Sequence, residues 1–383
     1  MIQRSYLDYN ATAPLRPEVR DAVTAALALQ GNPSSVHTEG RTARAAIEDA
    51  RAKVAALVGA KPADVIFTSG GTEANGLALA AQSGEASWHC YVSAIEHPSV
   101  LSGGRFYPET TTVIPVTRDG IADLMVLAKK LEKHKPGGWR PIVSLMAANN
   151  ETGAIQPVAE AAKIVHDAGG LLHCDAVQAA GRVSLDIAKL GADMVTLSAH
   201  KMGGPKGVGA LVLAEGVTVE PLIKGGGQEG RRRAGTENVS GIIGFGVAVE
   251  LAAADLARMD EIAKLRDRLE IGVRAIARDA VVFAANVARL PNTACIAVPG
   301  AKSETLMIAL DLAGIAVSAG SACSSGKVET SHVLAAMGIS PELAQSAVRV
   351  SLGIGSENTD VERYLSAFGD VIKRLKQSAK EAA

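Results

Sequence analysis

Residues 193–209 read DMVTLSAHKMGGPKGVG and predict a buried strand, a polar turn and a hairpin. The apolar run 194–197 ends in the turn 198–201 (SAHK), and a second apolar run occupies 210–213. A lysine at the end of a buried strand costs roughly several kcal/mol to desolvate unless it is paired or used covalently. Burial also lowers the pKa of a lysine, which makes lysines that form Schiff bases nucleophilic. Lys201 is therefore a candidate functional residue, although a lysine that reaches solvent beside a turn is the simpler interpretation of this stretch alone.

The composition of the whole chain indicates a large protein whose net charge favours no strongly charged partner. It has 383 residues, 48% of them hydrophobic, which is enough for a large core and two or three domains. A formal net charge of −1 gives no attraction for nucleic acid or an anionic membrane. The cysteines Cys90, Cys174, Cys295 and Cys323 form no CxxC pair, so we expect no disulfide framework, no zinc site and a cytoplasmic location. We see no signal peptide and no apolar run that approaches ~20 residues.

Short apolar runs alternate with helical stretches after residue 64. This alternation predicts β-α-β units and a mostly parallel sheet with helices on both faces. We expect seven strands, near residues 65–67, 89–93, 112–116, 141–146, 171–174, 194–197 and 210–213. Helices are expected at 17–30, 37–58, 72–83, 122–133 and 157–168. Because ligands bind at the carboxyl ends of such strands, the residues directly after each strand are the candidates for a site.

The C-terminal third predicts a smaller α+β unit. A helical stretch at 238–277, broken near 255–259, leads into it. Its expected strands lie near 281–283, 294–298 and 347–351, and its helices near 303–313, 331–337 and 359–376. We therefore expect a large domain at 16–255 and a small domain at 256–383, with residues 1–15 packing on the small domain.

The strand ends carry residues of distinct chemistry. Residues 68–75 (TSGGTEAN) open a helix with small and hydroxyl residues, which make either an anion site or an ordinary capped helix start. His97 can stack on a flat ring and exchange protons near neutral pH. Asp175 ends a buried strand and needs a cation such as a protonated pyridine nitrogen, unless it is an N-cap. With Lys201, these residues are the set that pyridoxal 5'-phosphate needs: a phosphate site, a stacking ring, a partner for the ring nitrogen and an amine for the aldehyde.

Two further residues suggest the reaction. Residues 318–326 (SAGSACSSG) are small residues around Cys323, and they predict an exposed loop whose thiol becomes a nucleophile once deprotonated. The other three cysteines are expected to be small buried hydrophobes. Arg349 lies inside an apolar strand pattern and needs a partner, and a substrate carboxylate bound bidentately would serve.

The chain resembles cysteine desulfurases of the NifS/IscS type, in the class V aminotransferase family of fold-type I pyridoxal phosphate enzymes. The similarity runs from LDYNATAP (7–14) to VRVSLG (348–353). Its most specific stretches are TSGGTEANGLAL, AIEHPSV, NNETGAIQP, HCDAVQAAG, SAHKMGGPKGVGAL, GGGQEGRRRAGTENV and VSAGSACSSG.

This resemblance implies a role for each site residue. Lys201 would bond to the cofactor aldehyde and act as catalytic base, and His97 would stack on the ring and shuttle a proton. Arg349 would bind the carboxylate of L-cysteine, with Asn32 lining the pocket. The residues implied to hold the phosphate or the ring are Gly71, Thr72, Asn150, Asp175, Gln178, Ser198 and His200, with Thr236 from the other subunit of a homodimer.

The activity implied is removal of sulfur from L-cysteine, which yields L-alanine and a persulfide on Cys323. An acceptor or iron–sulfur scaffold protein would take the sulfur, and Cys323 would be at most a transient iron–sulfur ligand in a protein with no metal of its own. Other class V enzymes remain open, namely a selenocysteine lyase or an aminotransferase, as does an inactive scaffold partner. Gly71 and Ala199 stand where relatives often carry Ala and Gly. The short tail after residue 376 favours a NifS-like role, in nitrogenase maturation, over the housekeeping one.

Overall fold

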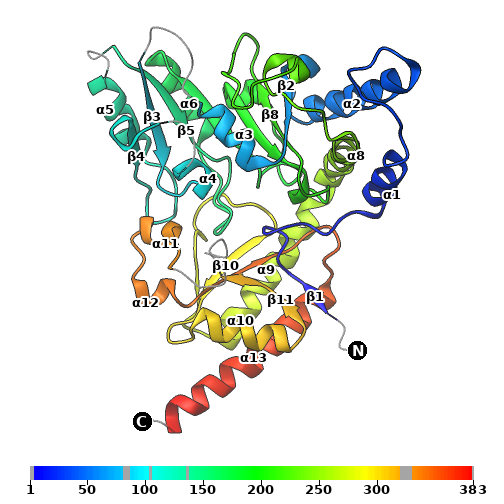
Figure 1. Ribbon diagram of the computed structural model, residues 1–383. Helices are drawn as coiled ribbons and strands as arrows, with labels where there is room; N and C mark the ends of the chain where they lie inside the picture. Colours follow the sequence, from blue (N-terminus) through cyan, green and yellow to red (C-terminus); the bar gives the residue numbers. More distant parts are fainter. Residues whose placement is uncertain (1–3, 81–86, 103–105, 135–137, 320–329, 382–383) are drawn as a thin grey trace.

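The computed structural model describes residues 4–80, 87–102, 106–134, 138–319 and 330–381. Figure 1 shows a unit built on a large sheet, and below it a smaller unit that contains both the start and the end of the chain. The large sheet has seven strands in the order β2-β8-β7-β6-β5-β3-β4. These strands are β2 (Val65–Thr68), β3 (Trp88–Ser93), β4 (Thr111–Ile114), β5 (Arg140–Ser144), β6 (Leu171–Asp175), β7 (Met194–Ser198) and β8 (Gly209–Leu213).

The prediction of a mostly parallel seven-stranded sheet is confirmed. Strand β8 alone among the seven runs antiparallel to its neighbours β7 and β2, and the other pairs are parallel. The hairpin between β7 and β8 requires this reversal, because a short turn cannot return the chain to a parallel position. Since β2 and β7 are both antiparallel to β8, they point the same way, and the residues that follow them meet at one edge of the sheet.

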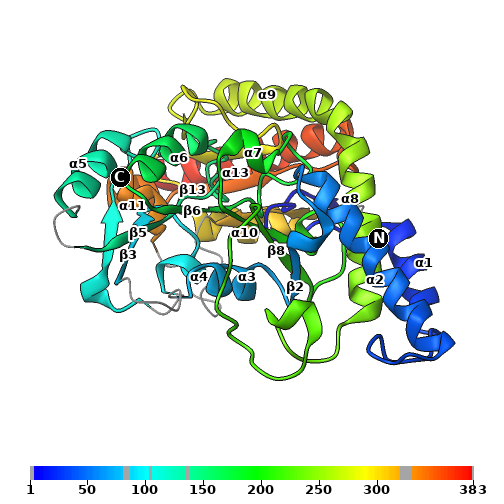
Figure 2. The ribbon, with the colours of Figure 1, turned by 90° about the horizontal axis from the view of Figure 1, so that it is seen from above.

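Helices cover both faces of the sheet, as Figure 2 shows for α6 and α7 on one side and α3 and α4 on the other. Alternate residues of one strand enter different cores: Tyr91 joins the core under α6, and Cys90 and Val92 join the core under α3. This explains why the strands are continuous apolar runs. The helices of this unit are α1 (Pro17–Ala26), α2 (Thr38–Leu57), α3 (Gly71–Ala78), α4 (Pro98–Leu101), α5 (Leu124–His134), α6 (Val158–Asp167), α7 (Ile187–Leu190) and α8 (Val239–Asp255).

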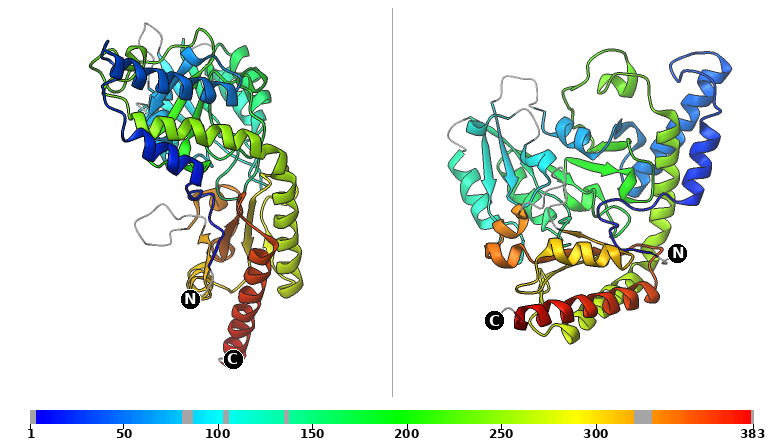
Figure 3. Two further views of the ribbon diagram at one scale, coloured as in Figure 1. Left: turned by 90° about the vertical axis from the view of Figure 1, so that its right-hand side faces the viewer. Right: turned by 60° about the horizontal axis from the view of Figure 1, so that its bottom comes forward.

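The smaller unit is built on an antiparallel sheet of order β12-β13-β10-β9. Figure 3 shows two of its helices, α9 and α13, side by side. Strand β1 (Ser5–Tyr6) pairs in parallel with β11 (Ile315–Ala316), so the N-terminal segment is attached to this unit. Its remaining elements are β9 (Val281–Val282), β10 (Thr293–Ala297), β12 (Ser318–Ala319), β13 (Ala347–Ser351), α9 (Met259–Ile276), α10 (Ser303–Leu312), α11 (His332–Ala336), α12 (Pro341–Ala344) and α13 (Asn358–Glu381).

The connection between the two units is helical. Helix α8 passes through a 3-10 turn, Leu256–Arg258, into α9, which confirms the predicted break near 255–259. Helix α8 is apolar on all sides because α1 and α2 pack against it. Residues Val239–Ile276 would satisfy a membrane span by length and composition alone, but half of the most apolar window is buried inside the protein, as in a core helix.

Helix α1 is shorter than predicted. It ends at Ala26, its last buried residue, whereas the sequence pattern predicted a helix to residue 30. Leu27 is 72% exposed and has no core to enter. Gly31, with φ of 112°, then adopts a backbone conformation that other residues rarely take. The helix therefore stops where burial stops supporting it.

His173 makes the folded protein sensitive to acid. It lies in β6, fully buried, with Nδ1 2.8 Å from Ser144 Oγ and Nε2 2.9 Å from Thr196 Oγ1. Burial lowers the pKa of His173 from 6.5 to about 4, while nearby Asp175 acts in the opposite direction. Between these two pH values the unfolded chain binds a proton that the folded chain does not. Stability is therefore lost as pH falls through this window.

From His173 we expect the free energy of unfolding to be about 2 kcal/mol lower at pH 5 than at pH 7. Urea unfolding at both pH values measures this difference. The variant His173→Gln keeps a side chain that hydrogen-bonds both hydroxyls but does not titrate, so its pH dependence should be shallower by the same amount. An unchanged pH dependence in this variant would contradict the assignment.

Candidate active site

A cavity of about 200 Å³ lies where β2, β3, β5, β6 and β7 end. Its wall is built from the segments that directly follow these strands, the position at which α/β sheets bind ligands. The predicted site residues in this wall are Gly71, Thr72, His97, Asn150, Asp175, Gln178, Ser198, His200 and Lys201. Residues far apart in the chain thus meet because parallel strands deliver their ends to one edge.

One end of the cavity is suited to an anion. Helix α3 begins at Gly71, after Gly70, which has no side chain that could cap the helix. The first N–H groups of a helix have no acceptor within it and, with the helix dipole, attract negative charge. A Cβ atom on Gly71 would lie 3.1 Å from Val177 Cγ2, so a larger residue would crowd Val177 in the cavity wall. Thr72 and Ser198, which each carry a hydroxyl, line the same cavity.

His200 completes this end as a neutral imidazole. Burial lowers the pKa of His200 to about 4, and the positive charges of Lys201 and Lys206 act in the same direction. Its Nδ1 lies 3.2 Å from Thr12 Oγ1. At neutral pH the ring is therefore uncharged and able to hydrogen-bond a phosphate oxygen.

A hydrogen-bonded chain joins Asp175 to His97. Asn75 Nδ2 donates to Asp175 Oδ2 at 2.8 Å and to Ser99 Oγ at 2.9 Å. His97 Nδ1 lies 2.7 Å from Ser99 Oγ and accepts from the Ser99 N–H at 3.1 Å. The other oxygen of Asp175, Oδ1, accepts from the Val177 N–H, so the carboxylate has a fixed orientation.

These hydrogen bonds and the burial of the ring determine the protonation state of His97. Burial lowers the pKa of His97, with Asp175 acting against this shift and Lys201 and His332 acting with it. The ring is thus neutral at neutral pH. Because Nδ1 accepts a hydrogen bond from a backbone N–H, the proton of the neutral ring is on Nε2. His97, in the wall of the cavity, therefore carries on Nε2 a proton that it can donate.

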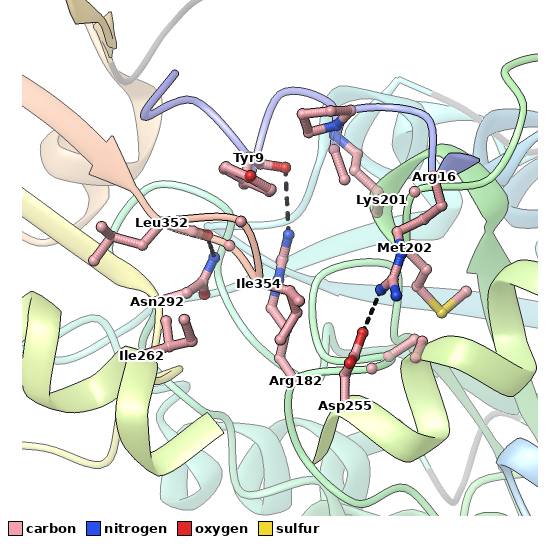
Figure 4. A pocket seen from close by; sticks show the side chains of 18 of the residues that line it. Tyr9, Arg16, Arg182, Lys201, Met202, Asp255, Ile262, Asn292, Leu352 and Ile354 are labelled. Atoms are coloured by element: carbon pink, nitrogen blue, oxygen red, sulfur yellow. Dashed lines mark hydrogen bonds and ion pairs between the residues drawn. The ribbon is translucent and has the colours of Figure 1, made fainter. Parts of the chain in front are cut away.

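The N-terminal segment holds the amine of Lys201. Lys201 Nζ donates to the backbone oxygens of Asn10 at 2.6 Å and Ala11 at 2.8 Å. Figure 4 shows Lys201 beside this segment. The Asn10 oxygen also accepts from Gln178 Nε2 at 3.0 Å. Two predicted cofactor residues are thus positioned by a stretch that carries no predicted site residue.

The side chain of Asn10 fixes that stretch in place. It is 1% exposed, and its Nδ2 donates to the Asn150 backbone oxygen at 3.1 Å and to Thr293 Oγ1 at 2.9 Å. Its Oδ1 accepts from Asn292 Nδ2 at 3.0 Å. Asn10 therefore connects Lys201 to strand β10 of the small unit.

Arg349 already has an acidic partner. Its Nη2 lies 2.7 Å from Asp8 Oδ1, and its Nη1 donates to the Asn150 backbone oxygen at 3.1 Å. The side chain is 4% exposed, and Nε has no hydrogen-bond partner among the described atoms. Arg349 does not line the cavity itself, but it contacts Asn150, which belongs to the cavity wall.

Two predicted residues lie outside this cavity. Asn32 is exposed in the loop before α2, where its Oδ1 accepts from the Ser34 N–H. Thr236 is also exposed, after a 3-10 turn at Gln228–Arg231. The resemblance assigned Thr236 to the cofactor site of a second subunit. Thr236 lies on the surface of this chain, and its contact with a second subunit stays a prediction.

Three of the four cysteines are inert. Cys90, Cys174 and Cys295 are buried, as predicted, and burial raises the thiol pKa of all three, that of Cys90 to about 12. A thiol with so high a pKa carries almost no thiolate at neutral pH. Cys323 lies outside the described residues.

Several site residues were missed by the sequence analysis. No role was predicted for Asn75. Its position four residues after Gly71 on α3 was a usable signal, because this spacing places the amide one helical turn from the anion end of the cavity. Asp8 and Asn10 gave no signal, because their side chains bond residues more than 100 positions away in the chain.

The residues of the cavity fit pyridoxal phosphate. They include an anion end, an amine on Lys201 for the aldehyde and a carboxylate on Asp175 for the ring nitrogen. Asn75 Oδ1 is buried with no partner in the described part of the chain, which is expected where a bound polar molecule supplies one. Among the residues that the structure describes, no group of three or more His, Cys, Asp or Glu side chains could hold a metal ion.

Comparison with known proteins gives consistent matches. The family model Aminotransferase class-V matches residues 5–364. The cysteine desulfurase IscS of Dictyoglomus turgidum is 41% identical, over 98% of this chain and 96% of its own length. A cysteine desulfurase of Cereibacter sphaeroides is 42% identical, over 98% and 97%. The solved structure of a NifS-like protein from Rickettsia africae superposes with a TM-score of 0.87 at 35% identity, over 97% of this chain and 100% of that one.

Proposed function

This chain belongs to the class V aminotransferase family, and we propose on that premise that it is a pyridoxal phosphate-dependent cysteine desulfurase. The observation that supports the proposal most is the meeting of Lys201, His97 and Asp175 in one cavity. Arg349, whose side chain can bind a carboxylate, contacts the wall of that cavity through Asn150. A substrate with a carboxylate, an amine and a reactive side chain suits this set.

The protein's residues divide the work on L-cysteine. When bound, pyridoxal phosphate supplies the electron sink that stabilises negative charge at the substrate Cα. Arg349 binds the substrate carboxylate, with Nε–H among the donors available to it. Lys201 Nζ takes the proton from Cα, and the carboxylate of Asp175 keeps the pyridine nitrogen protonated. His97 exchanges a proton with the substrate sulfur through Nε2.

Cys323 receives the sulfur in this proposal. Its thiolate attacks the substrate sulfur, as thiolates do in disulfide exchange. The bond between sulfur and Cβ breaks, and its electron pair stays with Cβ, which then takes a proton, and Lys201 returns the proton to Cα. The products are L-alanine and a persulfide on Cys323. The persulfide then passes to an acceptor protein.

The proposed assembly is a homodimer in the cytoplasm. Thr236 is exposed and available to a second subunit, where it would contact the cofactor phosphate. Asn32, in another exposed loop, would line the substrate pocket in such an assembly. We propose an iron–sulfur scaffold protein, such as one in nitrogenase maturation, as the sulfur acceptor.

The test is product analysis of the purified holoenzyme. With L-cysteine and a thiol reductant, we expect alanine and sulfide in equal amounts. Cys323→Ala should keep the cofactor absorbance but release sulfide at least about 100-fold more slowly, because it lacks the nucleophile. Cys90→Ala, which removes an inert thiol, is the matched control and should keep its rate.

Other outcomes would contradict the proposal. Formation of a keto acid without sulfide would indicate an aminotransferase, and turnover of selenocysteine without turnover of cysteine would indicate a selenocysteine lyase. A protein that binds no cofactor would be an inactive scaffold. Full activity of Cys323→Ala would leave the desulfurase function intact but refute the persulfide step.

A further inference from the structure

A second cavity, of about 350 Å³, shares Lys201 with the candidate active site as part of its wall. Figure 4 shows it between the N-terminal segment, the junction of α8 with α9, and the chain after β13. Most of its wall is aliphatic: Met202, Ala252, Met259, Ile262, Leu352 and Ile354. Nothing in the proposed reaction uses this cavity.

A buried cation without an acidic partner lies in this mostly aliphatic wall. Arg182 is 7% exposed, and each of its hydrogen bonds goes to a neutral oxygen. Its Nη1 donates to the backbone oxygen of Gln178 at 2.7 Å and to the side-chain oxygen of the same residue, and its Nη2 reaches the Tyr9 backbone oxygen at 3.4 Å. Within the described ranges, no Asp or Glu forms an ion pair with Arg182.

The charge of Arg182 is therefore uncompensated. Burial lowers the pKa of Arg182 to about 9, and the nearby charge of Arg349 acts in the same direction. The other guanidinium of the cavity, on Arg16, is neutralised by an ion pair with Asp255 and lies 3.8 Å from Glu18. A buried charge without a counter-ion is costly, so proteins pair it or hold an anion against it.

We propose that this cavity binds a small amphipathic monocarboxylate, whose carboxylate pairs with Arg182 and whose hydrocarbon part lies on the aliphatic wall. The volume is within the range of small-molecule sites. Of the cations that line the cavity, Arg16 is paired with Asp255 and Lys201 is bonded to the cofactor in the proposed reaction, so Arg182 leaves one positive charge for one carboxylate. A phosphate, which carries more charge, would need further cations.

The position of Arg182 connects this site to the candidate active site. Arg182 Nη1 holds the side-chain oxygen of Gln178, and Gln178 Nε2 donates to the same Asn10 oxygen that accepts from Lys201 Nζ. Arg349, the proposed binder of the cysteine carboxylate, does not line the cavity. A bound carboxylate should therefore change turnover without competing with cysteine.

The test uses the holoenzyme with hexanoate as the probe and hexanamide, its neutral analogue, as the control. At about ten times its dissociation constant, hexanoate should raise the Tm by roughly 2 °C, and hexanamide should not. Calorimetric titration should give one hexanoate per chain. Inhibition by hexanoate should be noncompetitive with L-cysteine.

Two variants test the site, one by removing its charge and the other by reducing its volume. Arg182→Met keeps the length and the apolar packing of the side chain but removes its charge, so the hexanoate response should disappear. If Arg182→Met does not fold, Ile354→Trp decides, because it narrows the cavity from its rim and leaves Arg182 in place; it should weaken hexanoate binding at least about tenfold.

Three results would overturn the proposal. One is an absence of hexanoate binding, as would follow if a second subunit filled the cavity. Another is an equal response to hexanoate and hexanamide. The third is competition with cysteine that persists in the cavity variants, which would place the probe at Arg349 instead. None of these results bears on the desulfurase activity, so the two proposals fail separately.

Discussion

Lys201→Ala is expected to lower kcat/KM for L-cysteine by at least about 10⁴-fold. Lys201 carries the amine in the wall of the 200 Å³ cavity, where backbone oxygens of Asn10 and Ala11 hold it. The proposed reaction uses this amine twice, once to bind the cofactor and once to take the proton from Cα. Steady-state kinetics with saturating cofactor measure the loss.

A chemical readout separates this role from a structural one. Borohydride should attach the cofactor irreversibly to the unmodified protein, and mass spectrometry should locate it on Lys201. Neither Lys201→Ala nor Lys201→Arg should be labelled, although arginine keeps the positive charge beside Asn10. Lys189→Ala, on exposed α7, should behave like the unmodified protein. Labelling of Lys201→Ala, or a native rate in that variant, would refute the assignment.

Glu229→Ala is expected to lower the free energy of unfolding by about 3–5 kcal/mol. The side chain of Glu229 is 2% exposed, and its two oxygens bind Arg51 Nη1 at 2.7 Å and Nη2 at 2.8 Å. One of them also accepts from the Phe67 N–H at 2.9 Å, at the edge of the large sheet. Loss of the carboxylate would leave the guanidinium of Arg51 buried beside β2, with half-exposed Glu48, 3.0 Å from Nε, as its remaining acidic partner.

The energetic reason for this loss can be tested with a double variant. Arg51→Met combined with Glu229→Leu removes both charges, so it should be more stable than Glu229→Ala alone. Glu215→Ala removes the exposed ion pair with Lys61 and should leave the urea midpoint unchanged. Additive losses in the double variant would show that the pair contributes through packing rather than through charge.

The sheet and most of the cofactor cavity could be predicted because both follow from local patterns. Apart from β4 at one edge, the strands of the large sheet are buried on both faces, so they appear in the sequence as largely apolar runs. The residues after those runs then meet by topology alone. Lys201, Asp175 and His97 could therefore be brought together before any contact between them was known.

The supporting contacts could not be predicted because they join parts of the chain with no pattern in common. Asp8 pairs with Arg349 across 341 positions, and Glu229 reaches Arg51 across 178. Arg349 was expected to await a substrate carboxylate, whereas Asp8 already binds it. Glu229, with φ of 47°, lies in an irregular segment where neither helical nor strand periodicity indicates which side chains are buried.

The N-terminal segment has a consequence for how the protein is made. Residues 5–12 leave the ribosome well before the segments that they contact, because β1 pairs with β11 near residue 315 and the Asn10 N–H donates to Ser351 Oγ. The carbonyls that hold Lys201 can therefore reach their final position only after residues 315–351 have been synthesised. Contacts of such long sequence separation form slowly. The newly made chain should thus pass through a stage in which the large sheet is folded but Lys201 is not yet held in place.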